Sequence, residues 1–265
     1  MIGQCSGALE RTGQTKKFMV ARVKAFIRPM IPAKLHARWK RYRFNSEQAH
    51  ARGRPLEEVF NEIYERGVWS PTPEDGKFHS GPGSMPAASH GYEDFVAGYV
   101  NARPEITTIV DIGCGDFQVS QRILQRLDQP VRYFGCDVAS KVVADNTARH
   151  AVPGKVDFLH ANVAKDTLPP GDIVTIREVL QHLSNETIHA ALNNLQQNYK
   201  YAIITEAVPR VPAAPNLDIV SGYRTRDGLN SGVFLELAPY NLKIVDRYEH
   251  LVSPREVLRT LVVEL

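Results

Sequence analysis

Residues 107–116 read Thr107-Thr108-Ile109-Val110-Asp111-Ile112-Gly113-Cys114-Gly115-Asp116. The first residues of this stretch are β-branched or apolar and predict a buried strand. The Asp111 carboxylate and two glycines follow at the point where the strand must turn into a helix beginning near Phe117. Glycine lacks the Cβ atom that blocks close approach to the backbone, and the first N–H groups of a helix are unpaired. We therefore expect a ligand to bind at this turn.

Two nucleotide-type ligands fit such a turn. A dinucleotide fold would place a third glycine at position 118, but the residue there is Gln118, which weakens that interpretation. Asp137 follows the next expected strand, where a carboxylate can accept hydrogen bonds from ribose hydroxyls of either cofactor. The alternative role for Asp137 is to cap the next helix, and Ser140 is better suited to that role.

Strands and helices alternate after the glycine turn, which is typical of a doubly wound, mostly parallel α/β sheet. Helices are expected near 119–127, at 141–150 and after Ser184, which we expect to be an N-cap. Two last stretches, 242–248 and 257–263, are expected to close the sheet as an edge hairpin. The other expected strands are 107–112, 131–136, 156–159, 172–177 and 200–206.

The segment before this sheet is expected to hold two helices and a long loop. Pro55 begins a helix over 56–65, and Tyr92, Val96 and Tyr99 lie on one face of a second helix. Between them, residues 69–89 are rich in proline and glycine and too long for a plain connector. We interpret them as a lid or binding loop, with an ordinary linker as the alternative.

The first 54 residues form a basic arm. They hold 13 Lys and Arg residues against Glu10 and Glu47, although the net charge of the 265-residue chain is only +3. We expect residues 1–54 to be partly disordered or helical and residues 55–265 to form one catalytic domain. Apolar residues recur among basic ones over 16–44, which favours contact with an anionic membrane surface or a partner protein. The alternative is packing on the catalytic domain or on a second subunit, and nucleic acid is not an expected partner.

Three cysteines, Cys5, Cys114 and Cys136, lack metal-ligand spacing, so neither a metal site nor a disulfide framework is expected. The sequence contains no run of about 18 apolar residues and no apolar leader typical of secretion. We expect a cytoplasmic protein whose basic arm can place it at the inner face of the membrane.

The glycine turn resembles the first motif of class I S-adenosylmethionine-dependent methyltransferases, which reads acid-x-Gly-x-Gly-x-Gly. Phe117 stands where the third glycine is usual. The run from Glu178 to Asn185, with sequence Glu-Val-Leu-Gln-His-Leu-Ser-Asn, resembles the motif that follows a strand in a bacterial methyltransferase family. Four more segments of this sequence resemble recurring features of that family: Trp69, residues 80–84, Tyr223-Arg224 and Ala238-Pro239-Tyr240.

This resemblance covers residues 56–265 and implies a seven-stranded Rossmann-like sheet with S-adenosylmethionine as cofactor. Members of the family often occur among proteins that build cell-surface polysaccharides, so a small-molecule or glycan-linked acceptor is implied. The turn would hold the methionine end of the cofactor, Asp137 the ribose and residues 161–162 the adenine. The expected cofactor-binding residues are Asp111, Gly113, Cys114, Gly115, Asp137, Val138, Ala161, Asn162 and Arg177.

Methyl transfer from a sulfonium is an in-line displacement, and a hydroxyl acceptor must also lose a proton. His182 is the expected general base, with stacking or loop capping as its alternative, and Glu178 is the second expected catalytic residue. Trp69, Ser84 and Arg224 are expected to bind the acceptor, and Arg224 could grip an acidic or phosphorylated group.

The leading interpretation is therefore O-methylation of a small or glycan-linked acceptor. N- or carboxyl-methylation would need less help from His182. A non-catalytic cofactor-binding partner subunit, with the basic arm as its working surface, is the alternative outside catalysis.

Overall fold

The computed structural model describes residues 33–69 and 78–265. The chain divides into two compact units, Met1–Ser46 and Glu47–Leu265. The expectations for residues 1–32, including the helical pattern that starts at Lys16, lie outside the described residues. The same holds for residues 70–77 of the expected lid.

One long helix, α2 (Ala33–Ala51), begins in the first unit and ends in the second. Three of its apolar residues, spaced by four and three positions and therefore on one face, are exposed: Leu35 at 55%, Trp39 at 54% and Tyr42 at 72%. The Arg43 guanidinium lies 5.0 Å from the centre of the Trp39 ring.

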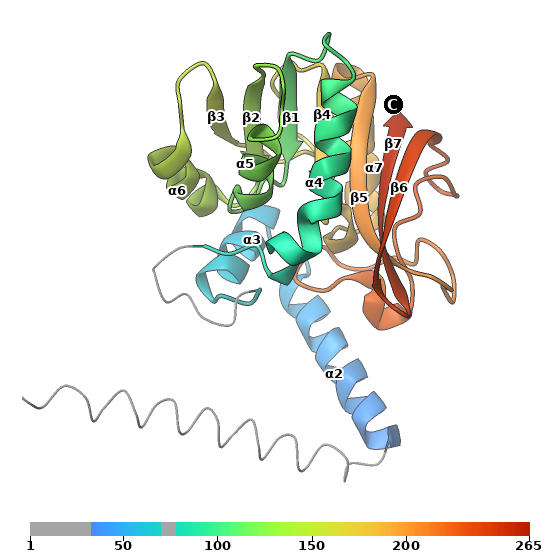
Figure 1. Cartoon of the computed structure of the whole chain (residues 1–265). Coiled ribbons are helices and arrows are strands. Elements are labelled where there is room, and N and C mark those ends of the chain that lie inside the picture. The colour runs from blue at the N-terminus through green and yellow to red at the C-terminus, as the bar shows by residue number, and fades with distance from the viewer. Residues whose placement is uncertain (1–32, 70–77) are drawn as a thin grey trace, which may run out of the picture. The chain divides into compact units, whose positions relative to one another are not determined.

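A seven-stranded sheet forms the second unit, with strand order β3-β2-β1-β4-β5-β7-β6 (Figure 1). The first five strands in this order run parallel, and β7 is antiparallel to both of its neighbours. This confirms the doubly wound, mostly parallel sheet and the C-terminal hairpin expected from the sequence. The strands are β1 (Thr108–Ile112), β2 (Arg132–Asp137), β3 (Val156–His160), β4 (Ile173–Arg177), β5 (Tyr201–Pro209), β6 (Lys243–Ser253) and β7 (Glu256–Glu264).

The helices of this unit are α3 (Leu56–Glu65), α4 (Pro86–Asn101), α5 (Gln118–Leu124), α6 (Ser140–His150) and α7 (Asn185–Asn198), with the short 3₁₀ helices η2 (Pro82–Ser84), η3 (Leu180–His182) and η4 (Arg226–Leu229). The expectation of a loop reaching residue 89 was wrong, because Pro86 starts α4 at its first position, where no backbone N–H is needed. The helix expected to reach residue 127 ends at Leu124. Ser184 caps α7 as expected, since its side chain accepts a hydrogen bond from the Thr187 N–H at 3.2 Å.

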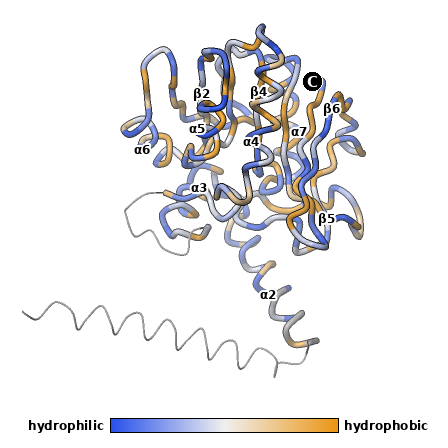
Figure 2. The backbone as a smooth tube through the Cα atoms, viewed as in Figure 1, coloured by the Kyte–Doolittle hydropathy of each residue, from blue (hydrophilic) through white to orange (hydrophobic). Residues whose placement is uncertain are grey.

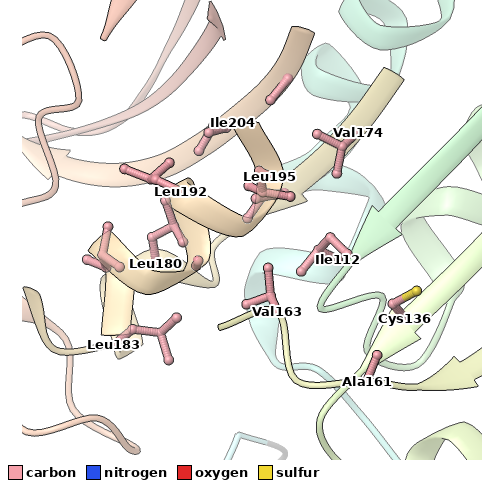
Figure 3. Packing of buried hydrophobic residues seen from close by; sticks show 14 of the residues in the cluster. Ile112, Cys136, Ala161, Val163, Val174, Leu180, Leu183, Leu192, Leu195 and Ile204 are labelled. Carbon is pink, nitrogen blue, oxygen red and sulfur yellow. The ribbon is translucent and has the colours of Figure 1, made fainter. Parts of the chain in front are cut away.

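The strands alternate their side chains between two hydrophobic layers. Ile109 and Ile173 belong to one buried cluster, together with residues of α4 and α5, while Val110 and Val174 belong to the other, together with residues of α6 and α7. Figure 3 shows part of the second layer, with Leu192 and Leu195 of α7 beside residues of the sheet. The sheet is therefore covered on both faces, as a parallel sheet requires.

In Figure 2, where the tube is coloured by residue hydropathy, stretches of hydrophobic residues in orange lie along the inner strands. The edge strand β6 is mostly exposed, with Val245 and Leu251 about half accessible. Within residues 33–69 and 78–265, no helix is long and apolar enough to cross a membrane.

Because β1, β2 and β4 are adjacent and parallel, their carboxyl ends meet at one edge of the sheet, where ligands bind in open α/β folds.

Candidate active site

The turn after β1 brings backbone close to two other segments. Gly113 and Gly115 both have positive φ angles, +72° and +54°. A Cβ on Gly113 would overlap Val179 Cγ2, and one on Gly115 would overlap Ser80 Oγ. Both positions therefore need glycine for conformation and for space.

Phe117, at the position of the usual third glycine, also has a positive φ, +64°. Its ring is buried, 5.0 Å from the Phe158 ring and 5.2 Å from the Tyr133 ring. Phe117 therefore packs at the start of α5, and its aromatic contacts compensate for a backbone conformation that glycine adopts more readily.

Asp111 is a buried hub at the end of β1. Its Oδ1 accepts a hydrogen bond from Thr175 Oγ1 at 2.8 Å, and its Oδ2 accepts from Ser120 Oγ at 2.5 Å and from Tyr133 Oη at 2.7 Å. Burial raises the pKa of Asp111, and the three hydroxyl donors oppose that rise. The carboxylate thus joins β1, β2, β4 and α5 at the residue that precedes the glycine turn by two positions.

Asp137 ties the end of β2 to the same turn. Its Oδ2 accepts from the Gly115 N–H at 3.0 Å and its Oδ1 from the Ala139 N–H at 2.8 Å. Each oxygen keeps the capacity for a second donor, such as a ribose hydroxyl. The expectation that Ser140 caps α6 was wrong, because Ala139 occupies the N-cap position without a side-chain bond, and Ser140 Oγ accepts from Asn61 Nδ2 instead.

Beyond Asp137, Val138 and the segment after β3 form the next part of the cavity wall, with Ala161 and Asn162. The Asn162 side-chain oxygen accepts from the Ala164 N–H at 3.0 Å. This bond orients the amide, so that its NH₂ group remains as a donor for a ligand.

The end of β4 carries an ion pair on a strained backbone. Arg177 Nη2 lies 2.9 Å from Glu178 Oε1 and donates to the Gly83 carbonyl at 2.9 Å. Arg177 Nε is buried and has no hydrogen-bond partner among the described residues. Glu178 has a φ of +56°, an uncommon conformation for a non-glycine residue that concentrates at functional sites.

His182, in η3, is 9% exposed and lies near two aromatic rings. Its ring centre is 5.3 Å from that of Trp69 and 6.5 Å from that of Phe60. Burial lowers the pKa of His182 to about 4, so the imidazole is neutral at pH 7. Nδ1 lies 3.2 Å from the Gly222 carbonyl, an acceptor, so Nδ1 carries the proton and Nε2 keeps a lone pair.

One cavity of about 420 Å³ is lined by every site residue expected from the sequence. Arg224 is already paired with Glu47 and lies against Tyr223, so an anionic acceptor would compete with Glu47 for it. Among residues 33–69 and 78–265, no group of three or more metal-ligating side chains forms a metal site. The lining residues expected from the sequence are Trp69, Ser84, Asp111, Gly113, Cys114, Gly115, Asp137, Val138, Ala161, Asn162, Arg177, Glu178, His182 and Arg224.

Residues 80–84, at the end of the segment interpreted from the sequence as a lid or binding loop, also line this cavity. Ser80 lies against Gly115, and Gly83 lies against the Glu178 carboxylate. Ser80 Oγ is also 3.2 Å from Tyr64 Oη. The sequence predicts only Ser84 of this segment as a site residue, whereas Ser80, Gly81, Pro82 and Gly83 line the cavity as well. Tyr64 was part of an expected helix, and its spacing of four residues from Phe60 was the available signal that it shares the cavity-facing side.

Comparison with known proteins supports a methyltransferase site. Residues 110–200 match the family model described as a methyltransferase domain. This range includes the glycine turn, Asp137, Asn162 and the loop after β4. No curated protein matches the sequence closely enough to count as a relative.

Solved structures share the fold. The magnesium protoporphyrin IX methyltransferase of Synechocystis with bound S-adenosylmethionine has a TM-score of 0.53 at 15% identity, covering 81% of this chain and 99% of that chain. Human N-acetylserotonin methyltransferase, also in complex with this cofactor, has a TM-score of 0.52 at 14% identity, covering 84% and 66%. The N-methyltransferase NodS of Bradyrhizobium japonicum with S-adenosylhomocysteine has a TM-score of 0.52 at 14% identity, covering 77% and 98%. Since N-methylation occurs on this fold, the fold alone does not fix the acceptor atom.

Proposed function

We propose that this S-adenosylmethionine-dependent methyltransferase methylates a hydroxyl oxygen of a small or glycan-linked acceptor. The cofactor supplies an electrophilic methyl group on a sulfonium. The protein must then hold the acceptor oxygen in line with that methyl group and receive the hydroxyl proton.

The observation that carries this proposal is the position of the His182 ring, whose Nδ1 lies 3.2 Å from the Gly222 carbonyl. Its Nδ1–H donates to the Gly222 carbonyl, so Nε2 is the basic nitrogen of a neutral ring on the cavity wall. Trp69 and Phe60 pack near the ring and limit its rotation. A neutral, oriented imidazole can receive a proton from an acceptor hydroxyl at neutral pH.

The cofactor subsites follow the carboxyl ends of the strands. Gly113, Cys114 and Gly115 line the cavity and would border the methionine end, and Asp137 has acceptor capacity for ribose hydroxyls. Val138, Ala161 and the Asn162 amide would border the adenine. Arg177 would act near the methionine end, held in place by the Gly83 carbonyl.

The acceptor would enter beside Trp69 and Arg224, with Glu178 near the reacting oxygen. Glu178 is held by Arg177, so its carboxylate is positioned to accept a hydrogen bond from the acceptor. Ser84 is buried, and its carbonyl accepts from Arg122 Nη2 at 2.7 Å, so its contribution to acceptor binding would be to shape the cavity wall.

The test compares His182→Ala with a matched control, His189→Ala, whose ring contacts Tyr240 and does not line the cavity. The assay follows labelled methyl transfer to surface-glycan extracts and to simple phenols and sugars. We expect His182→Ala to lose about 10²-fold or more in turnover with unchanged cofactor affinity by titration calorimetry. Full turnover in His182→Ala would contradict the general-base role and favour N- or carboxyl-methylation. Cofactor binding without transfer to any pool would favour a cofactor-binding partner subunit.

We also propose that residues 16–44 bind an anionic membrane surface from the cytoplasmic side. The described part of this segment exposes Leu35 and Tyr42 on one helix face, among several basic residues. Each basic residue near such a surface can add about 1 kcal/mol. Vesicles of phosphatidylserine and phosphatidylcholine should retain the full chain and release a variant lacking residues 1–45. Equal retention of both would contradict the membrane role.

A further inference from the structure

Two buried ionisable side chains converge on the loop that follows β4. Glu206 of β5 is 3% exposed, and Arg226 of η4 is 1% exposed. Burying a charge is costly unless hydrogen bonds compensate for the lost water. Both side chains obtain those bonds from the main chain of residues 180–183.

Glu206 holds this loop by its N–H groups. Its Oε1 accepts from the Leu180 N–H at 2.8 Å and its Oε2 from the Gln181 N–H at 2.9 Å. The Gln181 side chain returns to the same strand, because its Oε1 accepts from the Ala207 N–H at 3.3 Å.

Arg226 holds the same loop by its carbonyl groups. Nη1 donates to Leu180 O at 3.2 Å and Gln181 O at 3.3 Å, and Nη2 donates to Leu183 O at 2.8 Å. Nη2 also donates to Asn185 Oδ1 at 2.7 Å. Leu180 and Gln181 are thus bonded through their N–H groups to Glu206 and through their carbonyl groups to Arg226.

The held segment, residues 180–183, contains one expected catalytic residue and closely follows the other. Glu178, with its positive φ, precedes it, and its N–H donates to Thr205 O at 2.7 Å, next to Glu206 on β5. His182 belongs to it, and the Gly222 N–H donates to His182 O at 2.8 Å. A displacement of Leu180 or Gln181 would therefore move the His182 ring relative to the cavity.

We propose that Glu206 and Arg226 are positioning residues that fix the loop bearing Glu178 and His182 for methyl transfer, without contacting cofactor or acceptor. This inference rests on the proposed function, because it assigns the loop to the acceptor side of the reaction. Neither residue lines the cavity, so their effect on cofactor binding should be small.

The experiment uses Glu206→Gln and Arg226→Lys in the full chain. Thr260→Val is the matched control, because Thr260 is 1% exposed and its Oγ1 accepts from Thr205 Oγ1 at 2.9 Å, beside Glu206, without touching the loop. Four quantities are measured: amide exchange of residues 180–183, the pKa of His182 by NMR, affinity for S-adenosylmethionine, and kcat. If Arg226→Lys does not fold, Glu206→Gln, which retains an acceptor oxygen, carries the test.

We expect exchange at residues 180–183 to rise at least tenfold, the pKa of His182 to rise from about 4 toward 6.5, and kcat to fall at least tenfold. Cofactor affinity should stay within threefold, and Thr260→Val should leave all four near wild type. Unchanged exchange and an unchanged His182 pKa would overturn the positioning role, as would a normal kcat despite a loosened loop. If His182→Ala remains fully active while the two variants still loosen the loop and reduce kcat, the proposed general base fails and the positioning role stands.

Discussion

Ser80 and Asp116 exchange two hydrogen bonds across the glycine turn. The Ser80 N–H donates to Asp116 Oδ2 at 2.9 Å, and the Asp116 N–H donates to Ser80 Oγ at 2.8 Å. The Asp116 carboxylate also accepts from Gln118 Nε2 at 2.8 Å. This reciprocal pair fixes the loop of residues 78–84 over the backbone that borders the cavity.

We predict that Ser80→Ala and Asp116→Asn each weaken S-adenosylmethionine binding about tenfold. Ser80→Ala removes the acceptor of one bond, and Asp116→Asn replaces one carboxylate oxygen by an NH₂ group and removes the charge. A hydrogen bond of this kind contributes roughly 1 kcal/mol, more when the bond is to a carboxylate. Titration calorimetry measures the effect. Asp145→Asn, which breaks only the exposed pair with Arg149, is the control and should bind normally. Equal affinity in all three variants would mean that the pair does not support cofactor binding.

The burial of His182 predicts an unusual acid limit for the reaction. Its pKa in the folded protein is about 4, against an ordinary value of 6.5. If Nε2 is the base, kcat/KM for the acceptor should stay constant down to about pH 5 and fall only near pH 4. The same group stabilises the fold fully above pH 6.5, and that stability is lost as pH falls from 6.5 toward 4, because the unfolded chain binds the proton first. A pH profile of kcat/KM is the measurement. A fall in kcat/KM near pH 6.5 would contradict the prediction, because it would mean that the His182 ring is hydrated and keeps its ordinary pKa.

The positive φ of Phe117 predicts that its glycine variant is more stable than its alanine variant, the opposite of the usual order. Phe117→Ala loses the aromatic packing, at a cost of about 3–5 kcal/mol, and keeps a residue with a side chain at positive φ. Phe117→Gly loses the same packing but relieves about 1–2 kcal/mol of backbone strain. We expect the glycine variant to be more stable than the alanine variant by about 1 kcal/mol in urea unfolding.

The control for this order is Phe134 in β2, a buried position with an ordinary strand backbone. There, glycine should be less stable than alanine by about 0.5–1 kcal/mol, because it loses more conformational freedom on folding. The same order at both positions would show that strain at Phe117 is negligible.

The sequence predicted what local patterns encode. Residues 107–116 specify β1 and its turn, since both the apolar run and the glycines are local signals. Hairpin strand β7 was expected at 257–263, and it occupies Glu256–Glu264. The length of β5 was underestimated, because its end at Pro209 is set by pairing with Glu256, which is remote in sequence.

The sequence predicted those site residues that belong to a recognisable motif. It did not predict the residues whose role depends on contacts between segments that are distant in the sequence. His182 and Asp137 stand in recognisable runs. Arg226 does not, because the loop carbonyls of residues 180–183 that it bonds lie more than 40 residues earlier in the chain. Similarly, nothing in a Glu residue indicates a positive φ at Glu178, which depends on the meeting of β4, β5 and residues 80–84.

Glu206 predicts a pH dependence of stability opposite in sign to that of His182. Burial raises its pKa to about 8, against an ordinary value of 4.5, with the two loop N–H donors and Arg226 opposing the rise and Glu178 adding to it. Between pH 4.5 and 8, the folded chain therefore holds a proton that the unfolded chain has released. Stability from this group falls as pH rises through that window and is constant above it, with a total change on the order of a few kcal/mol.

Glu206→Gln removes this titration and leaves the other groups in place. We expect the difference in free energy of unfolding between wild type and Glu206→Gln to shrink as pH rises from 5 to 8.5, measured by urea unfolding at each pH. Taking the difference cancels the contributions of groups common to both proteins, including His182. Thr260→Val should give a difference that is independent of pH. A parallel pair of curves for wild type and Glu206→Gln would show that Glu206 is already ionised at pH 5, with its charge fully compensated by the loop N–H groups and Arg226.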